Sequence, residues 1–325
     1  MGTVVLGTGS CLPSRVLSNV DLEQIVDTSD EWIRTRTGIE NRRIGGPGEK
    51  TYQIAARAAS EALSMAGVTA ADISLLIVGT ISSHMLMPSC ACFVQQEIGA
   101  DNAFAYDVNA ACSGFLYGLD IADKHIRADR QAKVLVIGAE ALSSRLNWQD
   151  RNTCILFGDG AGAAVLGHVE DERRRILGTN HRSDGRLWQL LYMHQSPSTN
   201  PDLLVPDNPG VHIIMEGREV FKHAVKAMED AVDGVLRATG MSIWDIDLLI
   251  PHQANIRILK KLMERLDIPE EKVILNVMHY GNTSAASIPI ALDETNRAGL
   301  LQPGKTVLFC SFGGGFTWGA TLLRW

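Results

Sequence analysis

An internal repeat constrains the fold of this 325-residue chain more than any other feature. Residues 63–77 align without a gap onto residues 236–250, and seven of the fifteen positions are identical. Each copy ends a helical pattern at a glycine, Gly67 or Gly240, and continues into a short apolar segment typical of a buried strand. A second, shorter sequence similarity relates residues 157–160 to residues 312–315. The two offsets, 173 and 155 residues, are similar, so the chain is predicted to contain two related halves.

Each half is predicted to be a layered α/β structure. Continuous apolar runs predict strands at 75–79, 103–108, 134–138, 155–157 with 163–166, 248–251, 273–277, 307–311 and 320–323. Amphipathic patterns predict helices at 51–66, 89–98, 112–127, 217–238, 255–266 and 284–298. Fully apolar strands separated by helices indicate sheets that are covered on both faces.

The domain organisation follows from the repeat. We expect an N-terminal half over residues 1–174 and a C-terminal half over residues 175–325, which meet at a charged connection near residues 170–175. The stretch 181–209 is rich in Pro, Asn, Asp and Ser, and is expected to form a long irregular surface loop or lid.

Composition excludes several classes of protein. A net charge of −7 disfavours nucleic acid as a partner, and no apolar run approaches the ~18 residues that a membrane helix needs. The N-terminus shows no secretory signal pattern, and the six cysteines contain no CxxC pair. No cluster has metal-ligand spacing, and no phosphate-binding loop of the Walker type is present. These observations predict a cytoplasmic protein of enzyme size with free thiols.

Cys112 is the strongest candidate nucleophile. It lies between a predicted strand and a predicted helix, among small residues that allow a tight turn. Backbone N–H groups at a helix start stabilise a thiolate, which is the reactive form of cysteine. The alternative is a small buried thiol that fills a helix–strand junction. That structural interpretation is favoured for the other five cysteines.

Three further motifs lie where predicted strands end, the edge at which open α/β sheets bind ligands. His252 follows the strand of the second repeat copy, and Asn282 precedes the predicted helix at 284–298. Gly313, Gly314 and Gly315 separate the last two predicted strands, where backbone N–H groups can approach a ligand oxygen. Taken singly, these motifs also fit a hydrogen-bonded histidine, a helix-capping asparagine and a tight hairpin.

Six motifs together resemble the bacterial β-ketoacyl-acyl-carrier-protein synthase III family. They are Thr-Ser-Asp-Glu-Trp-Ile-Arg-Thr-Arg-Thr-Gly at 28–38, Asn-Ala-Ala-Cys-Ser-Gly-Phe at 109–115, Phe-Gly-Asp-Gly-Ala-Gly-Ala at 157–163, Pro-His-Gln-Ala-Asn at 251–255, Gly-Asn-Thr-Ser-Ala-Ala at 281–286 and Phe-Gly-Gly-Gly-Phe-Thr-Trp-Gly at 312–319. The resemblance covers nearly the whole chain. It implies a thiolase-like fold with a duplicated α-β-α-β-α core, in agreement with the repeat.

The resemblance also implies an activity, namely initiation of type II fatty-acid synthesis. Cys112 would take an acyl group from acyl-CoA, with acetyl-CoA as the default primer, and malonyl-acyl-carrier protein would then lose CO₂ and condense with it. His252 and Asn282 would donate hydrogen bonds during decarboxylation, and the N–H groups of Cys112 and Gly314 would form the oxyanion hole. No metal or redox cofactor is implied.

The remaining contacts are implied in the same way. Residues matching the CoA-binding positions of the family are Thr28, Trp32, Arg36, Arg151, Gly217, Phe221 and Asn255. Those matching its acyl pocket are Met87, Leu142 and Phe157, with Met87 reaching into the partner subunit of a homodimer. Many members carry Phe at that position, so the primer preference is open. Lys222, Arg257, Lys260 and Lys261 are expected to dock the acidic carrier protein, although a solvated helical face is the alternative for the lysines other than Lys222.

Other functions share these residue types. Cys, His and Asn in this order also occur in papain-type proteases, but the local cysteine signature of that class is absent here. Related condensing enzymes that make polyketides or alkylquinolones share the catalytic residues. A cysteine thioesterase and a non-catalytic carrier-binding module are further alternatives.

Overall fold

The computed structural model describes residues 2–171, 173–195 and 210–325. Its strands are β1 (Gly2–Cys11), β2 (Arg15–Ser18), β3 (Asn41–Ile44), β4 (Leu75–Gly79), β5 (Phe104–Val108), β6 (Val134–Ala141), β7 (Asp159–Val169), β8 (Arg175–Ser183), β9 (Leu191–Met193), β10 (Ile213–Met215), β11 (Leu248–Pro251), β12 (Thr306–Gly313) and β13 (Thr317–Arg324). Its helices are α1 (Asn19–Leu22), α2 (Asp30–Thr37), α3 (Thr51–Ala66), α4 (Cys90–Ile98), α5 (Gly114–Ala128), α6 (Gly217–Thr239), α7 (Ile256–Leu266), α8 (Val277–Tyr280) and α9 (Ser287–Arg297). Within these ranges, none of the helices is both long and apolar enough to cross a membrane.

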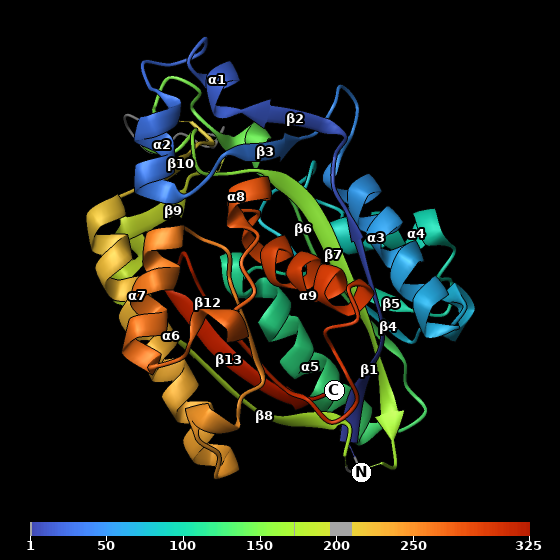
Figure 1. Ribbon diagram of the computed structural model, residues 1–325. Helices are drawn as coiled ribbons and strands as arrows, with labels where there is room; N and C mark the ends of the chain where they lie inside the picture. Colours follow the sequence, from blue (N-terminus) through green and yellow to red (C-terminus); the bar gives the residue numbers. More distant parts are fainter. Residues whose placement is uncertain (1, 172, 196–209) are drawn as a thin grey trace.

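Two main sheets organise the molecule (Figure 1). The first has the strand order β1-β7-β6-β4-β5, with β4 parallel to both β5 and β6, and β7 antiparallel to both β6 and β1. The second has the order β11-β12-β13-β8, with β11 parallel to β12 and the next two pairings antiparallel. The second sheet therefore repeats the first with one strand fewer. Two small sheets, β2-β3 and β10-β9, lie outside this repeat.

The two copies of the sequence repeat fold in the same way. Helices α3 and α6 end at Gly67 and Gly240, whose φ angles of 63° and 67° are in the left-handed region that glycine adopts without strain. A one-turn 3₁₀ helix with a capping box follows each glycine and leads into β4 or β11. The prediction of a duplicated layered core is confirmed. The boundary between residues 174 and 175 stays a prediction.

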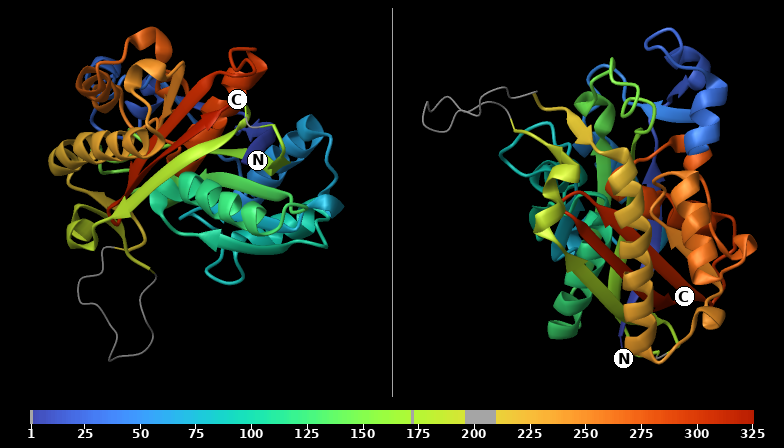
Figure 2. Two further views of the ribbon diagram at one scale, coloured as in Figure 1. Left: turned by 90° about the horizontal axis from the view of Figure 1, so that it is seen from below. Right: turned by 90° about the vertical axis from the view of Figure 1, so that its left-hand side faces the viewer.

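Apolar packing between the sheets creates five layers (Figure 2). Helices α5 and α9 lie between the sheets, where Phe115 and Leu292 share one buried cluster with Val136 of β6 and Phe309 of β12. The outer face of the first sheet packs against α3 and α4, and that of the second sheet packs against α6 and α7. Burial of these faces on both sides explains why the strands read as continuous apolar runs.

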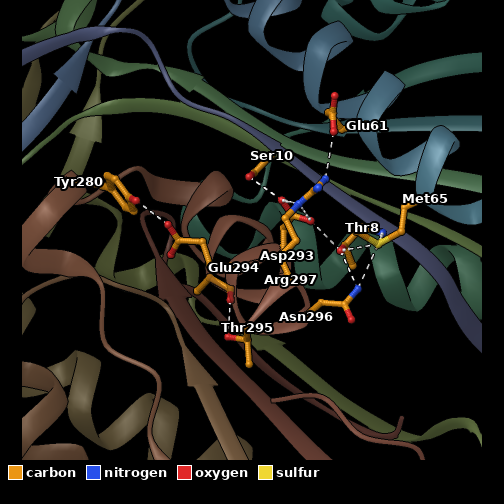
Figure 3. Close-up of polar contacts among 11 residues, drawn as sticks. Thr8, Ser10, Glu61, Met65, Tyr280, Asp293, Glu294, Thr295, Asn296 and Arg297 are labelled. Carbon is orange, nitrogen blue, oxygen red and sulfur yellow. Dashed lines mark hydrogen bonds and ion pairs between the residues drawn. The ribbon is translucent and has the colours of Figure 1, made fainter. Parts of the chain in front are cut away.

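Polar contacts fix the central helix α9 against the first half of the chain (Figure 3). The Asp293 carboxylate accepts hydrogen bonds from the hydroxyls of Thr8 and Ser10 on β1, at 2.8 and 2.7 Å. Arg297 pairs with the same carboxylate and with Glu61 of α3. Because Asp293 is buried, these partners compensate the cost of removing its charge from water.

Two predicted strands are wrong. Residues 273–277 form one isolated bridge, between Val273 and Leu249, and Val277 then begins α8. Residues 155–157 lie in a turn, and Phe157 makes a single bridge to Asn282. Both segments are apolar because they are buried, residues 155–157 in the wall of the cavity described below and residues 273–277 against the hydrophobic core, so periodicity did not distinguish them from strands.

The interpretation of residues 181–209 as irregular is also wrong for its first part. Strand β8 runs to Ser183, a 3₁₀ helix covers Gly185–Leu190, and β9 follows. Strand β9 pairs with β10, so this segment has regular partners that single-sequence patterns do not show. Residues 196–209 of the expected loop or lid lie outside the described residues.

Candidate active site

A cavity of about 570 Å³ brings the three predicted catalytic residues together, with Cys112 from the first half and His252 and Asn282 from the second. Other predicted site residues that line it are Trp32, Arg36, Phe157, Gly217, Phe221, Asn255 and Arg257. Its wall also contains Leu191 of β9, Met215 of β10 and Arg218 of α6, which the sequence analysis missed. Leu191 lies within the segment 181–209 that we expected to be a loop, Met215 and Arg218 follow it, and no motif marked these residues.

The Cys112 turn is strained and held from two sides. Cys112 is the middle residue of a one-turn 3₁₀ helix between β5 and α5, and the preceding Ala111 has a φ of 46°, unfavourable for a residue with a Cβ. The Thr317 hydroxyl of β13 donates to the Ala110 carbonyl at 2.8 Å. A Cβ on Gly313 would lie 2.6 Å from the Cys112 nitrogen, so only glycine permits this approach of the β12–β13 hairpin. The glycine run does form the tight hairpin considered as its alternative interpretation, and this hairpin abuts the Cys112 turn.

Burial opposes ionisation of the Cys112 thiol. Cys112 is 8% exposed, and desolvation raises the pKa of its thiol to about 12. Cys112 precedes the amide end of α5, a position that favours a thiolate, but desolvation of the sulfur outweighs this effect. The raised pKa favours the neutral thiol over the thiolate that the sequence led us to expect.

His252 is held in place by its backbone and by one ring nitrogen. It follows β11, and its N–H donates to the Cys310 carbonyl of β12 at 2.8 Å. The ring Nδ1 lies 2.7 Å from the Ser287 hydroxyl, while Nε2 is buried and has no hydrogen-bond partner among the described residues. Complete burial lowers the pKa of His252 to about 3, so the ring is neutral at physiological pH.

Asn282 is oriented by the backbone around it. Its N–H donates to the Leu156 carbonyl, and its own carbonyl accepts from Gly158. The side-chain oxygen accepts the Ser284 N–H at 2.8 Å. This bond occupies the oxygen of the carboxamide and leaves its NH₂ group as the donor available to a ligand in the cavity.

Glu140 is a buried carboxyl that the sequence analysis missed. It lies in β6, and its Oε2 accepts hydrogen bonds from Thr80, Ile81 and Ser82. Desolvation raises the pKa of Glu140 to about 7, although hydrogen bonds from Ser82, Ile81, Ser284 and Thr80 oppose the rise. A negative charge here also raises the pKa of Cys112. The one acidic residue within the apolar run 134–141 was the available signal.

Aromatic and cationic side chains gather at one side of the cavity. The guanidinium carbons of Arg36 and Arg151 lie 4.6 and 5.0 Å from the centre of the Trp32 ring. Arg151 does not itself line the cavity, and neither does Thr28, whose hydroxyl is buried without a partner in the described structure. Asn255 caps α7 by accepting the Arg257 N–H, so its side-chain oxygen is already engaged.

The other predicted site residues lie apart from the cavity wall. Leu142 is fully buried behind it, and Met87 is 84% exposed on the surface. A Cβ on Gly314 would meet the Leu191 carbonyl at 2.9 Å, which places this glycine against β9. Of the predicted docking residues outside the wall, Lys222 and Lys261 lie within 4 Å of Glu219 and Glu264, whereas the exposed Lys260 forms no ion pair with the residues described.

The duplicated five-layer architecture is the thiolase-like fold, and a buried cysteine facing a neutral imidazole and a carboxamide makes the protein a condensing enzyme of that class. Family models for 3-oxoacyl-[acyl-carrier-protein] synthase III match residues 106–185, and models for its C-terminal part match residues 236–325. The chain belongs to the β-ketoacyl-acyl-carrier-protein synthase III family of acyltransferases, which initiates type II fatty-acid synthesis from acyl-CoA and malonyl-acyl-carrier protein. This membership removes the protease, thioesterase and binding-module alternatives.

Relatives match over the full length. A β-ketoacyl-[acyl-carrier-protein] synthase III of Desulfotalea psychrophila is 59% identical over 325 residues, with all of both chains covered. The crystal structure of the Aquifex aeolicus enzyme has a TM-score of 0.93 at 48% identity and also covers both chains fully. The priming β-ketosynthase of the R1128 polyketide pathway has a TM-score of 0.91 at 36% identity, covering 99% of this chain and 96% of that one.

The buried Glu140 makes a prediction about pH. Between its ordinary pKa of 4.5 and its raised pKa of about 7, the folded protein holds a proton that the unfolded chain releases. The contribution of Glu140 to the free energy of unfolding is therefore fully present below pH 4.5 and is lost as the pH rises through about 7. Glu140→Gln cannot ionise at this position. The unfolding free energy of the variant minus that of wild type should therefore be about 3 kcal/mol larger at pH 8 than at pH 4.5.

Urea denaturation of both proteins at the two pH values measures this difference. The comparison of wild type with variant at each pH cancels the other titrating groups, which both proteins share. A difference in unfolding free energy that is equal at the two pH values would show that Glu140 does not titrate in this range.

Proposed function

We propose that the condensation runs in two half-reactions on the Cys112 sulfur. In the first, the sulfur attacks the thioester carbonyl of an acyl-CoA, the bond from that carbonyl to CoA breaks, and the thiol proton leaves with CoA. In the second, malonyl-acyl-carrier protein loses CO₂, and the resulting enolate carbon attacks the acyl-Cys112 carbonyl. The bond between this carbonyl carbon and the Cys112 sulfur then breaks, the β-ketoacyl product departs on the carrier protein, and the released thiolate takes a proton from solvent. The observation that carries this proposal is the cavity shared by Cys112, His252 and Asn282.

Decarboxylation places negative charge on the thioester oxygen of the malonyl group. His252 is suited to stabilise it because the ring is neutral and its Nε2 is unpartnered in the described structure. Asn282 offers its NH₂ group because its oxygen is already bonded to Ser284. Two desolvated hydrogen-bond donors can stabilise a developing oxyanion without either donor carrying a positive charge. For the acyl transfers, the N–H groups of Cys112 and Gly314 remain the proposed oxyanion hole.

The entrance fits the nucleotide part of CoA. Arg36 and Arg151 flank Trp32, which gives an aromatic face with two cations for a purine ring and its phosphates. Gly217, Phe221 and Asn255 line the same cavity as Cys112, whereas Thr28 is proposed as a CoA contact on the family match alone. We propose acetyl-CoA as the default primer.

Carrier-protein docking is proposed on the adjoining face of α6 and α7. Arg257 lines the cavity and lies 6.0 Å from the centre of the Phe221 ring. Lys222 and Lys260 are exposed nearby on the same two helices. These cations would meet the acidic carrier protein at the opening through which its malonyl arm must enter. The cytoplasmic location stays a prediction.

We propose a homodimer because the first sheet ends in an edge strand that pairs with a neighbour on one side only. Strand β5 is at the sheet edge, and Phe104 at its start is 55% exposed. Leu86 and Met87 are 85% and 84% exposed, an unusual exposure for large apolar side chains. A second copy that pairs along β5 would cover these groups and bring Met87 to the partner's acyl pocket, beside Phe157.

The nucleophile is tested by intact-mass spectrometry after mixing with acetyl-CoA. One acetyl adduct is expected on wild type and none on Cys112→Ala, because the other five cysteines do not line the cavity. Cys92→Ala is the control, since Cys92 is also partly accessible and should leave the adduct unchanged. An adduct that survives Cys112→Ala would refute the assignment.

The two donors are tested in the second half-reaction. His252→Ala and Asn282→Ala should still form the acetyl adduct, but should release CO₂ from malonyl-acyl-carrier protein about 10²–10³-fold more slowly. Normal decarboxylation in either variant would remove that residue from the mechanism.

The entrance is tested by steady-state kinetics. Arg151→Ala should raise KM for acetyl-CoA about tenfold with little change in kcat, because a cation beside Trp32 is lost from a binding contact. Arg34→Ala is the matched control, since Arg34 lies on the same helix as Trp32 but pairs with Asp30 and Glu40. Equal KM values for the two variants would contradict the proposal.

The dimer is tested by sedimentation. Met87→Asp should shift the protein toward monomer, because it places a charge in the proposed interface. Val20→Asp introduces the same charge at a side chain that is 60% exposed, away from β5, and should leave the mass unchanged. A monomeric wild type at micromolar concentration would count against the proposal.

A further inference from the structure

The neutral His252 ring can carry its single ring proton on either nitrogen, and only one of these forms suits the proposed role. With the proton on Nε2, the ring donates a hydrogen bond into the cavity. With the proton on Nδ1, it presents a lone pair there, which would repel a thioester oxygen that is gaining negative charge. The group that contacts Nδ1 therefore decides whether the site can stabilise the enolate.

That group is the hydroxyl of Ser287, the first residue of α9. Its oxygen lies 2.7 Å from Nδ1 and 3.3 Å from the backbone nitrogen of Gln253. The Gln253 N–H can only donate, so the Ser287 oxygen accepts this bond. Ser287 is 2% exposed, and within the described structure Nδ1 is the one acceptor that its hydroxyl proton reaches.

We infer that Ser287 donates its hydroxyl proton to Nδ1 of His252 and thereby holds the ring in the form that carries hydrogen on Nε2. In the opposite form, the Ser287 oxygen would accept from two N–H groups while its own buried proton had no partner, an arrangement that folded proteins avoid. Ser287 is thus a positioning residue for the decarboxylation step. It touches neither substrate nor sulfur, and the inference rests on the proposed role of His252.

The surroundings keep the hydroxyl at this place. Helix α9 is fixed to β1 and α3 through Asp293 and Arg297 (Figure 3). On the other side, the Gln253 side chain donates to the carbonyls of Pro251 and Ile274, and its oxygen accepts from the N–H groups of Asn276 and Val277. Both partners of the His252–Ser287 contact are therefore anchored independently of any ligand.

The ring form can be measured without enzyme activity. In wild-type protein labelled with ¹⁵N-histidine, long-range ¹H–¹⁵N spectra at pH 7 should show the His252 proton on Nε2, with the signal assigned by its loss in His252→Ala. A proton on Nδ1 in wild type would overturn the inference, whatever the variants do.

Ser287→Ala tests the consequence. It should give a mixed or reversed ring form, decarboxylate malonyl-acyl-carrier protein about 10- to 100-fold more slowly, and still form the Cys112 adduct at a rate within about twofold of wild type. Thr295→Val is the matched control, because it removes another buried hydroxyl from α9 that donates within the helix, to the Ala291 carbonyl. It should change neither the spectrum nor the rate.

The outcomes separate the two proposals. Unchanged decarboxylation in His252→Ala would reject the role of the ring itself. Slow decarboxylation in His252→Ala together with a wild-type ring form and rate in Ser287→Ala would reject only the role of Ser287. An equal rate loss in Thr295→Val would show that the effect is a general loss of packing in α9.

Discussion

Removal of water from the end of the cavity governs the chemistry of this protein. Burial disfavours charge on Cys112 and His252 alike, so the thiol and the imidazole are both neutral at rest. In such surroundings, a hydrogen bond to an oxygen that becomes negative is worth far more than it is in water. The Asn282 and His252 side chains each have one polar atom bonded within the protein, Oδ1 to Ser284 and Nδ1 to Ser287, which leaves Nδ2 of Asn282 and Nε2 of His252 for a ligand.

The duplication explains how one site came to contain two kinds of chemical group. In each half, a 3₁₀ turn precedes the central helix, and the residue that begins this turn has a left-handed φ, 46° at Ala111 and 50° at Ser284. The first turn presents the Cys112 sulfur, whereas the second fixes the Asn282 carboxamide and leads to Ser287. A Cβ on Gly138 of β6 would lie 2.1 Å from the Ala285 carbonyl, so the second turn packs directly on the first sheet.

Much of this architecture could be predicted from the sequence, for physical reasons. The amphipathic patterns, the glycine helix ends and the fully apolar strands are local signals, and the amphipathic patterns placed all six predicted helices correctly. Segments 155–157 and 273–277 were misassigned because burial in the cavity wall or in the core produces the same apolar pattern as a strand. Leu191, Met215 and Glu140 were missed because their roles depend on which segments the fold brings together. Motifs identified Cys112, His252 and Asn282, but not the hydroxyl behind the imidazole.

The direct packing of one turn on the opposite sheet has a mechanical consequence. Sulfur and imidazole belong to different halves of the polypeptide, so no rigid local segment sets their separation. It is set instead by how the five layers are stacked, so a shift of one sheet relative to the other would change the distance between sulfur and imidazole. Close backbone contacts at glycines such as Gly138 therefore help to fix the position of one layer relative to the next.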